Sequence, residues 1–382
     1  MPTSKRRRQK TSPRPRTTRR PTTRRGAAED VLRLRGPASL VSATPYLVGF
    51  VPERSLVLVA LDEDAPRARV VGSARIDLDP DPVSVLRAFV RQAVNRGSTG
   101  VMVLVYDDQV AGQPLAHSEL IERVEGLLAD EGLRLFDALY VRDEDSVWRW
   151  WSYLCVDQTC CPASGLTVAR SSPVDAEAVG RGLVALGSRR DLVAELLPDA
   201  AAVAAVTAKL EPWSRCVADH PRWRSAEVSS IDETILRSAR GVSEPEARDR
   251  TCDASPDLMA RHLVALADVG VRDLVLVQPE RDEIEAALRY WRRLVCAAPM
   301  QLRAPAATLL AVACLQSGDG ARANVALDVA LAAEPDYNLA GLVAVALSSG
   351  AVTPDDLVSS LAKAHAEERR RLSGLLAAAA DK

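Results

Sequence analysis

Two short runs of almost purely apolar residues constrain the fold of this chain most. They read SLVLVAL at Ser55–Leu61 and VMVLVY at Val101–Tyr106. Each run is short for a helix, and its valines favour extended backbone. We therefore expect two strands, the second of them buried in a sheet.

The segments around these runs alternate between strand and helix patterns. Ala68–Ile76 and Leu133–Val141 are further candidate strands, and Pro82–Arg96 and the segment after Ser118 carry apolar residues at helical spacing. The order strand, strand, helix, strand, helix, strand predicts an α/β unit over residues 29–170, with a mainly parallel sheet and packed helices. An antiparallel hairpin at the sheet edge is compatible with the same order.

Residues 171–382 have the pattern of an all-α unit. Arg189–Leu197, Asp257–Val269 and Asp282–Ala297 are the clearest candidate helices. The sequence Ser230–Glu233 has the form of a capping box, which predicts that a helix begins there.

Residues 304–337 resemble one helical hairpin of the tetratricopeptide type. With Pro335 as the proline that ends the repeat, small residues fall where two antiparallel helices touch. These residues are Ala311, Gly318, Ala323 and Ala330. Because a single copy cannot bury its own apolar face, we expect it to pack against the preceding helices rather than to form a peptide-binding array.

The first 28 residues differ sharply in composition from the rest. They contain eleven lysines and arginines and no acid, whereas the whole chain has 49 basic and 51 acidic side chains. Subtraction leaves 38 basic and 51 acidic groups in residues 29–382, a net charge of −13. With almost no apolar residue to bury, segment 1–28 is expected to be a disordered basic arm.

Such an arm can bind nucleic acid or another polyanion non-specifically through residues 5–25, because phosphate contacts release condensed counterions. It contains no aromatic residue, so base stacking and sequence reading are not expected. The arginines expected to contact phosphates are Arg6, Arg7, Arg8, Arg19, Arg20, Arg24 and Arg25. An equally supported alternative is a solvated tail that aids solubility or docks back on the acidic body.

The sequence favours a cytoplasmic protein that does not contact membranes. The longest apolar run, Ala304–Leu315, contains Pro305 and is shorter than the roughly 18 residues of a spanning helix. No apolar segment follows the basic arm, as it would in a secretory signal. The seven cysteines are an odd number, which suits reduced thiols better than a disulfide framework.

Three cysteines, Cys155, Cys160 and Cys161, lie close together in a tryptophan-rich stretch. Thiolates bind Zn²⁺ and exchange disulfides, so a metal or redox site is one interpretation. The spacing argues against it, since zinc sites use two well-spaced pairs and adjacent side chains diverge. We expect a buried loop held by thiols and indoles, with no bound metal.

Polar residues at the strand ends are the candidates for ligand binding. Asp107 and Asp108 follow the strand at Val101–Tyr106, and ligands collect at the carboxyl ends of strands in open α/β sheets. Paired carboxylates there can hold Mg²⁺, although a solvated loop is the simpler interpretation. Ser55 stands at the start of the first strand run, either as the end of a turn or in a polar site. A cleft uniting Ser55, Asp107 and Tyr153 would indicate a ligand site.

Motifs that would identify an enzyme are missing from the sequence. There is no phosphate-binding loop of the form GxxxxGK[ST], no HExxH and no GxSxG. None of the four histidines is paired at metal-binding spacing. Catalytic residues and cofactors therefore stay unassigned.

Several stretches together resemble a known family. They are LVSATPYLVGFVPERS at Leu40–Ser55, WSYLC at Trp151–Cys155, CCP at Cys160–Pro162, GDGA at Gly318–Ala321 and LAAEP at Leu331–Pro335. The combination is similar to an actinobacterial family, the domain of unknown function 4192. The resemblance covers nearly the whole chain after the basic arm, and it implies membership without implying an activity.

Two hypotheses follow from the sequence. The first is a non-catalytic interaction protein whose arm contacts a polyanion and whose helical half binds a protein partner. The second is a small-molecule or metal-dependent enzyme or binder that uses the strand ends of the α/β unit. The lack of catalytic motifs favours the first, although a fold of this kind can host either.

Overall fold

The computed structural model describes residues 34–63, 69–78, 83–109, 115–144, 146–155, 161–180, 183–214, 221–240, 254–278, 281–349 and 354–380. The chain divides into two units, residues 1–33 and residues 34–382. The basic arm lies outside the described residues, so its disorder stays a prediction.

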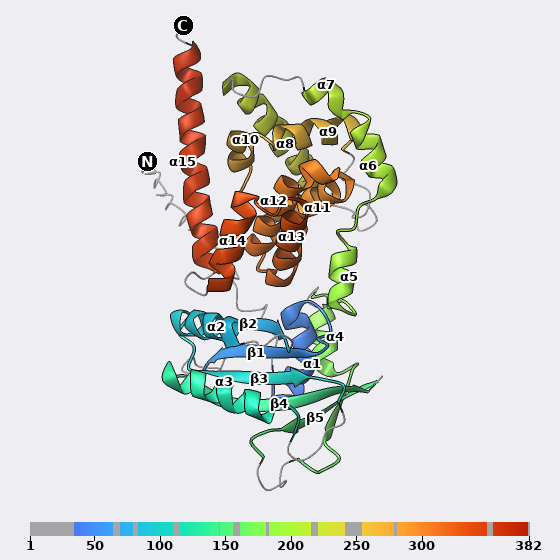
Figure 1. Ribbon diagram of the computed structural model, residues 1–382, viewed down its shortest axis with the longest axis vertical. Helices are drawn as coiled ribbons and strands as arrows, with labels where there is room; N and C mark the ends of the chain where they lie inside the picture. Colours follow the sequence, from blue (N-terminus) through green and yellow to red (C-terminus); the bar gives the residue numbers. More distant parts are fainter. Residues whose placement is uncertain are drawn as a thin grey trace, which may run out of the picture. The chain divides into compact units, whose positions relative to one another are not determined.

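The described residues form one six-stranded sheet in the order β2-β1-β3-β4-β5-β6 (Figure 1). The strands are β1 (Ser55–Asp62), β2 (Arg69–Asp77), β3 (Gly100–Tyr106), β4 (Arg134–Glu144), β5 (Val147–Ser152) and β6 (Leu166–Ala169). The first four correspond to the four strands that the sequence predicts. Every residue of β3 is buried, as expected for a strand in the interior of the sheet.

The prediction of a mainly parallel sheet is wrong. Within the described sheet only β3 and β4 are parallel neighbours, and every other pair is antiparallel. In the β1–β2 hairpin, β2 lies at the edge of the sheet and β1 lies inside it. The helix after β2 therefore carries the chain across β1, and β3 then pairs antiparallel with β1 on its other side. The chain then crosses once more to a parallel β4 and continues as an antiparallel meander through β5 and β6.

Alternation along the strands divides the apolar side chains between two cores. Leu56, Leu58 and Ala60 pack on one face with the helices α2 (Val83–Asn95) and α3 (Ser118–Asp130). On the other face Val57 and Val59 pack with helix α1 (Pro37–Val48) and with β5 and β6. The sheet is therefore a layer between two apolar clusters, as the period of two predicts.

The remaining elements of the described chain are helices. They are α4 (Pro173–Gly180), α5 (Arg189–Ala194), α6 (Ala200–Thr207), α7 (Leu210–Ser214), α8 (Pro221–Arg240), α9 (Pro256–Ala265), α10 (Val269–Leu274), α11 (Arg281–Ala297), a 3₁₀ turn (Met300–Leu302), α12 (Arg303–Gln316), α13 (Gly320–Ala333), α14 (Asn338–Ser349) and α15 (Pro354–Ala380). None of the described helices combines the length and the apolar character needed to cross a membrane.

Helices α12 and α13 form a hairpin joined by Ser317–Asp319, and they lie at the centre of the helical core (Figure 1). All residues of α12 from Arg303 to Leu315 are buried, and the helix packs against α11 as well as α13. Its inner surface is therefore covered. The predicted capping box is wrong, because Ser230 and Glu233 lie in the middle of α8.

Candidate functional site

Asp107 follows β3 directly and forms a hydrogen bond with a histidine that the sequence did not connect to it. Its Oδ2 lies 2.7 Å from Nε2 of His117, the residue just before α3. The Asp107 side chain is only 3% exposed and the His117 side chain is 27% exposed. The pair lies at the carboxyl end of the parallel strands β3 and β4, where α/β sheets commonly bind ligands.

The hydrogen bond between Asp107 and His117 determines which ring nitrogen of His117 can accept a further hydrogen bond. An ionised carboxylate can only accept, so a neutral His117 carries its proton on Nε2 and presents Nδ1 as an acceptor. Among the described residues no group hydrogen-bonds to Nδ1. His117 also has a left-handed backbone, with φ of 64°, which is uncommon outside glycine and sets the direction of the ring. The pair can hold a ligand donor or take up a proton.

Two tyrosines, Tyr140 and Tyr153, lie near Asp107 and His117. We call these four residues the strand-end cluster. Tyr140 of β4 donates to the carbonyl of Gln109 at 2.7 Å, and Tyr153 donates to the carbonyl of Ala116 at 2.6 Å. Burial, reinforced by the Asp107 charge, raises the pKa of Tyr140 to about 12. Burial likewise raises the pKa of Tyr153. Both hydroxyls therefore stay protonated and serve as donors.

Ser55 does not join this cluster. In the register of the sheet it pairs with Tyr106, so the two side chains share the face of α1, opposite to that of Val105 and Leu56. Its Oγ donates to the carbonyl of Glu53 and accepts from Arg75 Nε at 2.7 Å. A cleft uniting Ser55 with Asp107 and Tyr153, which would have indicated a ligand site, is therefore not formed by these three described residues.

The candidate pair of carboxylates at the end of β3 is also divided. Asp107 is buried against His117, whereas Asp108 is exposed. Across the described residues, no group of three or more His, Cys, Asp or Glu side chains is arranged to hold a metal ion.

The cysteine segment is only partly described. Cys160 lies outside the described residues. Cys161 is buried and Cys155 is half-buried, both in the apolar cluster that contains Trp148 and Trp150 of β5. Trp151 Nε1 donates to the carbonyl of Ala163 at 3.1 Å. The aromatic stretch forms strand β5, where the sequence predicted a loop.

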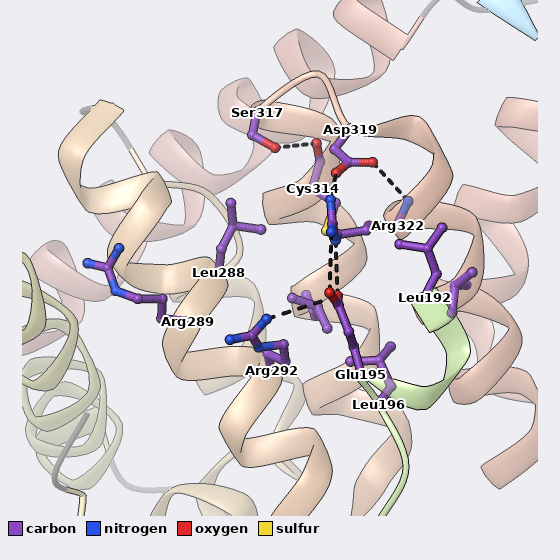
Figure 2. A pocket seen from close by; sticks show the side chains of 12 residues that line it. Leu192, Glu195, Leu196, Leu288, Arg289, Arg292, Cys314, Ser317, Asp319 and Arg322 are labelled. Carbon is purple, nitrogen blue, oxygen red and sulfur yellow. Dashed lines mark hydrogen bonds and ion pairs between the residues drawn. The ribbon is translucent and has the colours of Figure 1, made fainter. Parts of the chain in front are cut away.

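A cavity of about 220 Å³ lies in the helical half, between α5, α11, α12 and α13 (Figure 2). We call it the helical cavity. Its apolar wall is formed by Leu192, Leu196, Leu288, Leu310 and Val325. The buried thiol of Cys314 also lines it, and burial raises the pKa of that thiol.

Charged side chains line the other wall of the helical cavity. Arg322 Nε lies 3.1 Å from Glu195, and Arg322 Nη1 lies 2.7 Å from Asp319. These two carboxylates raise the pKa of Arg322 although burial opposes this. Arg292 contacts Glu195 more loosely, at 4.0 Å, and Figure 2 shows both arginines directed at the Glu195 carboxylate.

The helical cavity shares part of its lining with a larger cleft of about 1020 Å³. The shared residues are Glu195, Ser317, Asp319 and Arg322. The cleft continues to Tyr46–Phe50 at the end of α1 and to Arg75 of β2. Two of the stretches that carry the family resemblance, Leu40–Ser55 and Gly318–Ala321, thus line the same cleft.

Sequence reasoning found Asp107 and Tyr153 but missed their partners. His117 stands ten residues after Asp107, and only the turn into α3 brings the two together. The helical cavity gave no signal, because Glu195 and Arg322 are 127 residues apart. Among the charged residues of the cavity, only Asp319 has a role that depends on local spacing. It is the N-cap residue of α13, and its side chain accepts a hydrogen bond from the Arg322 amide.

Comparison with known proteins gives a family. The family described as Domain of unknown function (DUF4192) matches residues 37–354, which is most of the chain. No curated protein and no solved structure matches the chain. The matched range contains the sheet, the strand-end cluster and the helical cavity. The chain therefore belongs to the DUF4192 family.

Proposed function

We propose that the protein is a cytoplasmic, non-catalytic interaction protein that contacts nucleic acid or another polyanion through residues 5–25. The separation of charge carries this proposal: eleven basic side chains and no acid in residues 1–28, against a net charge of −13 in the rest. The acidic body repels a polyanion, so contact is confined to the arm.

The expected binding is non-specific and strongly salt-dependent. If about six arm side chains reach phosphates, affinity falls on the order of 10³-fold between 50 and 200 mM salt. The arm has no aromatic residue for stacking, so single-stranded oligonucleotides of different sequence should bind alike.

The test is a fluorescence-anisotropy titration of a labelled oligonucleotide. The full chain is compared with a chain starting at Glu29 and with a variant in which Arg6, Arg7, Arg8, Arg19, Arg20, Arg24 and Arg25 are glutamine. A matched control replaces seven exposed arginines of the body instead. Equal binding by the full and truncated chains, or binding that ignores salt, would rule out the arm as the contact.

A second candidate function is binding or conversion of a small molecule at the strand-end cluster. The 2.7 Å pair of Asp107 and His117 favours it, because a buried carboxylate that orients a partly exposed imidazole is an arrangement suited to proton transfer. Native mass spectrometry of protein purified without chelator tests it, with His117→Gln for comparison. A bound molecule or metal that is retained in wild type and lost in the variant would support this candidate. If the two proteins carry the same bound species, it fails.

The helical half is the proposed contact for a protein partner. The α12–α13 hairpin, which we interpret as tetratricopeptide-like, is covered on its inner side, so it is not the contact surface. Leu342 and Val345 of α14 are 60% and 64% exposed and lie on one helical face. Cross-linking from an α14 cysteine variant, compared with one in α15, would test this surface; equal cross-linking from both would speak against it.

A further inference from the structure

Strand β2 lies at one edge of the described sheet, and the register shows which of its backbone groups point outward (Figure 1). The Leu78 amide donates to the Arg54 carbonyl at 3.1 Å, just beyond the paired ends of β1 and β2. In an antiparallel pair such contacts recur at every second residue. The residues between them direct their amides and carbonyls away from β1. They are Ser73, Arg75 and Asp77.

The outward backbone groups of residues 73–77 form what we call the β2 edge. Within the described parts of the chain, no group hydrogen-bonds to these amides and carbonyls. The start of the strand is closed instead, because Arg96 donates to the Val71 carbonyl at 2.9 Å. A row of unpaired backbone groups is a template for a further strand. The β2 edge is about 14 Å long, which suits a short extended peptide.

The β2 edge lies in the cleft of about 1020 Å³ rather than on an open surface. Ser73, Arg75 and Asp77 line this cleft together with the turn between α12 and α13 and the end of α1. A strand added to β2 would lie about 4.8 Å from it, and therefore inside the cleft. Because other elements of the same chain enclose the edge, a single segment fits there better than the edge of a second sheet.

The side chains beside the β2 edge differ between the two faces of the sheet. Ala74 and Ile76 belong to the face of α2, where Val85 lines the cleft and is 46% exposed. On the other face, the side chain of Asp77 is 63% exposed, whereas its ion-pair partner Arg75 is 15% exposed. The accessible charge of that pair is therefore negative, and a carboxylate can accept several hydrogen bonds.

We propose that the β2 edge binds an extended segment of another protein as an added strand, with apolar side chains toward Val85 and basic side chains toward Asp77. Side chains of a strand alternate between the two faces, so the segment alternates apolar and basic residues. The net charge of −13 in residues 29–382 favours a basic segment as well. This site is separate from the basic arm, the strand-end cluster and the exposed face of α14.

The experiment is a fluorescence-anisotropy titration of the full chain into a labelled peptide of alternating lysine and valine, seven residues long. The basic arm repels this peptide, so binding reports on the body of the protein. Two further probes carry N-methyl groups on all lysine amides or on all valine amides. Only one of these sets directs its N–H groups at β2. We therefore expect at least tenfold weaker binding for one probe and nearly unchanged binding for the other.

A proline variant tests the backbone contact from the side of the protein. Ser73→Pro removes an outward amide and no bond to β1, and edge strands tolerate proline at such positions. It should weaken peptide binding at least tenfold. Ser73→Ala is the matched control, because both variants lose the hydroxyl contact to the Leu47 carbonyl and only proline loses the amide. Thermal unfolding checks that both variants fold.

Variants of α2 test the side-chain contact without a change in the backbone. Val85→Ser should weaken binding by about fivefold, because less apolar surface is buried against the peptide. Val94→Ser is the control, since Val94 is exposed on the same helix and does not line the cleft.

Four outcomes would overturn the proposal. They are no binding to wild type at millimolar concentration, equal binding by Ser73→Pro and Ser73→Ala, equal binding by Val85→Ser and Val94→Ser, and equal binding of the two methylated probes. A dimer of the wild type that Ser73→Pro dissociates, measured by analytical ultracentrifugation without peptide, would assign the β2 edge to a second copy of this chain and overturn it as well.

Discussion

His262 is a histidine enclosed in the helical core, where its charge cannot be solvated. The residue is 0% exposed, its Nε2 lies 2.9 Å from Ser230 Oγ, and its Nδ1 contacts the Tyr290 hydroxyl. Burial, assisted by the neighbouring charge of Arg261, lowers its pKa from 6.5 to about 3. The native protein therefore keeps a neutral imidazole where the unfolded chain would hold a proton.

This difference predicts an acid-sensitive stability. Below pH 6.5 the unfolded state binds a proton that the folded state excludes down to about pH 3, so stability is lost as pH falls through that window. One proton corresponds to a slope of about 1.4 kcal/mol per pH unit. His262→Gln should remove this part of the slope, measured by urea unfolding at pH 7.5, 6 and 5.

The control for this measurement is His365→Gln. Burial also lowers the pKa of His365, which is only half-buried and bonds to the Leu274 carbonyl at 2.9 Å, so its variant should change the slope less. An unchanged slope in His262→Gln would mean that His262 is protonated in the native state or that carboxylates alone set the acid sensitivity.

The residues that could be predicted from the sequence are those whose role depends on local spacing. Asp107 was found because it directly follows an apolar strand. His117 was not, because its contact requires the turn into α3 and an uncommon left-handed backbone. Glu195 and Arg322 meet only through tertiary packing, which leaves no periodic trace in the sequence.

Among elements, the pairing of β3 and β4 depends on a glycine. A Cβ at Gly100 would lie 2.4 Å from the Arg134 carbonyl oxygen and 2.7 Å from the Phe136 ring. Because backbone cannot move aside easily, Gly100→Ala should destabilise the protein by about 2–4 kcal/mol. Gly126→Ala in α3 is the counterpart: its Cβ meets open space, so we expect a gain of roughly 0.5–1 kcal/mol. Chemical denaturation of both variants tests this, and equal stabilities would refute the close approach.

Arg369 links helix α15 to the helical core through polar contacts. Arg369 Nη2 lies 2.7 Å from Asp232 of α8 and 2.9 Å from the carbonyl of Leu274 at the end of α10. Arg369→Ala should speed amide exchange in the second half of α15 by about tenfold, because it removes a charge-assisted contact worth about 1.5–3 kcal/mol. The exposed neighbour Arg370→Ala is the control. Equal exchange in the two variants would show that apolar packing alone holds α15.

The strand order shows why local sequence patterns predict which segments form strands and helices better than they predict how the strands are ordered in the sheet. Apolar runs and helix signals gave β1 to β4, α2 and α3 correctly, because each depends on local periodicity. The position of β1 between β2 and β3 is a matter of pairing between segments far apart in the sequence, which local patterns do not report. Strand β5 was missed because its tryptophans and cysteines were interpreted as a loop.

For the whole molecule, the apolar interior is divided into separate cores. Two clusters flank the sheet, and a third occupies the helical half. Phe50, which follows α1, is the exception: it is 4% exposed and belongs to the helical cluster. It also pairs with Leu186 in an isolated bridge, and Arg75 lies over its ring at 5.6 Å. Phe50 is therefore the main apolar link between the two halves.

Separate cores predict that the halves lose structure at different denaturant concentrations. Each half buries its own apolar surface, and few side chains are shared, so cooperativity across the whole chain is expected to be incomplete. Hydrogen exchange by mass spectrometry in rising urea would follow peptides of β1 and β3 against peptides of α11 and α12. Phe50→Ala removes a buried ring worth about 3–5 kcal/mol and should shift the transition of the helical peptides more than that of the strand peptides. Phe50→Leu, which keeps most of the apolar volume, should shift it less. If strand and helix peptides become exposed at one urea concentration in wild type and in Phe50→Ala alike, the two halves unfold as a single cooperative unit.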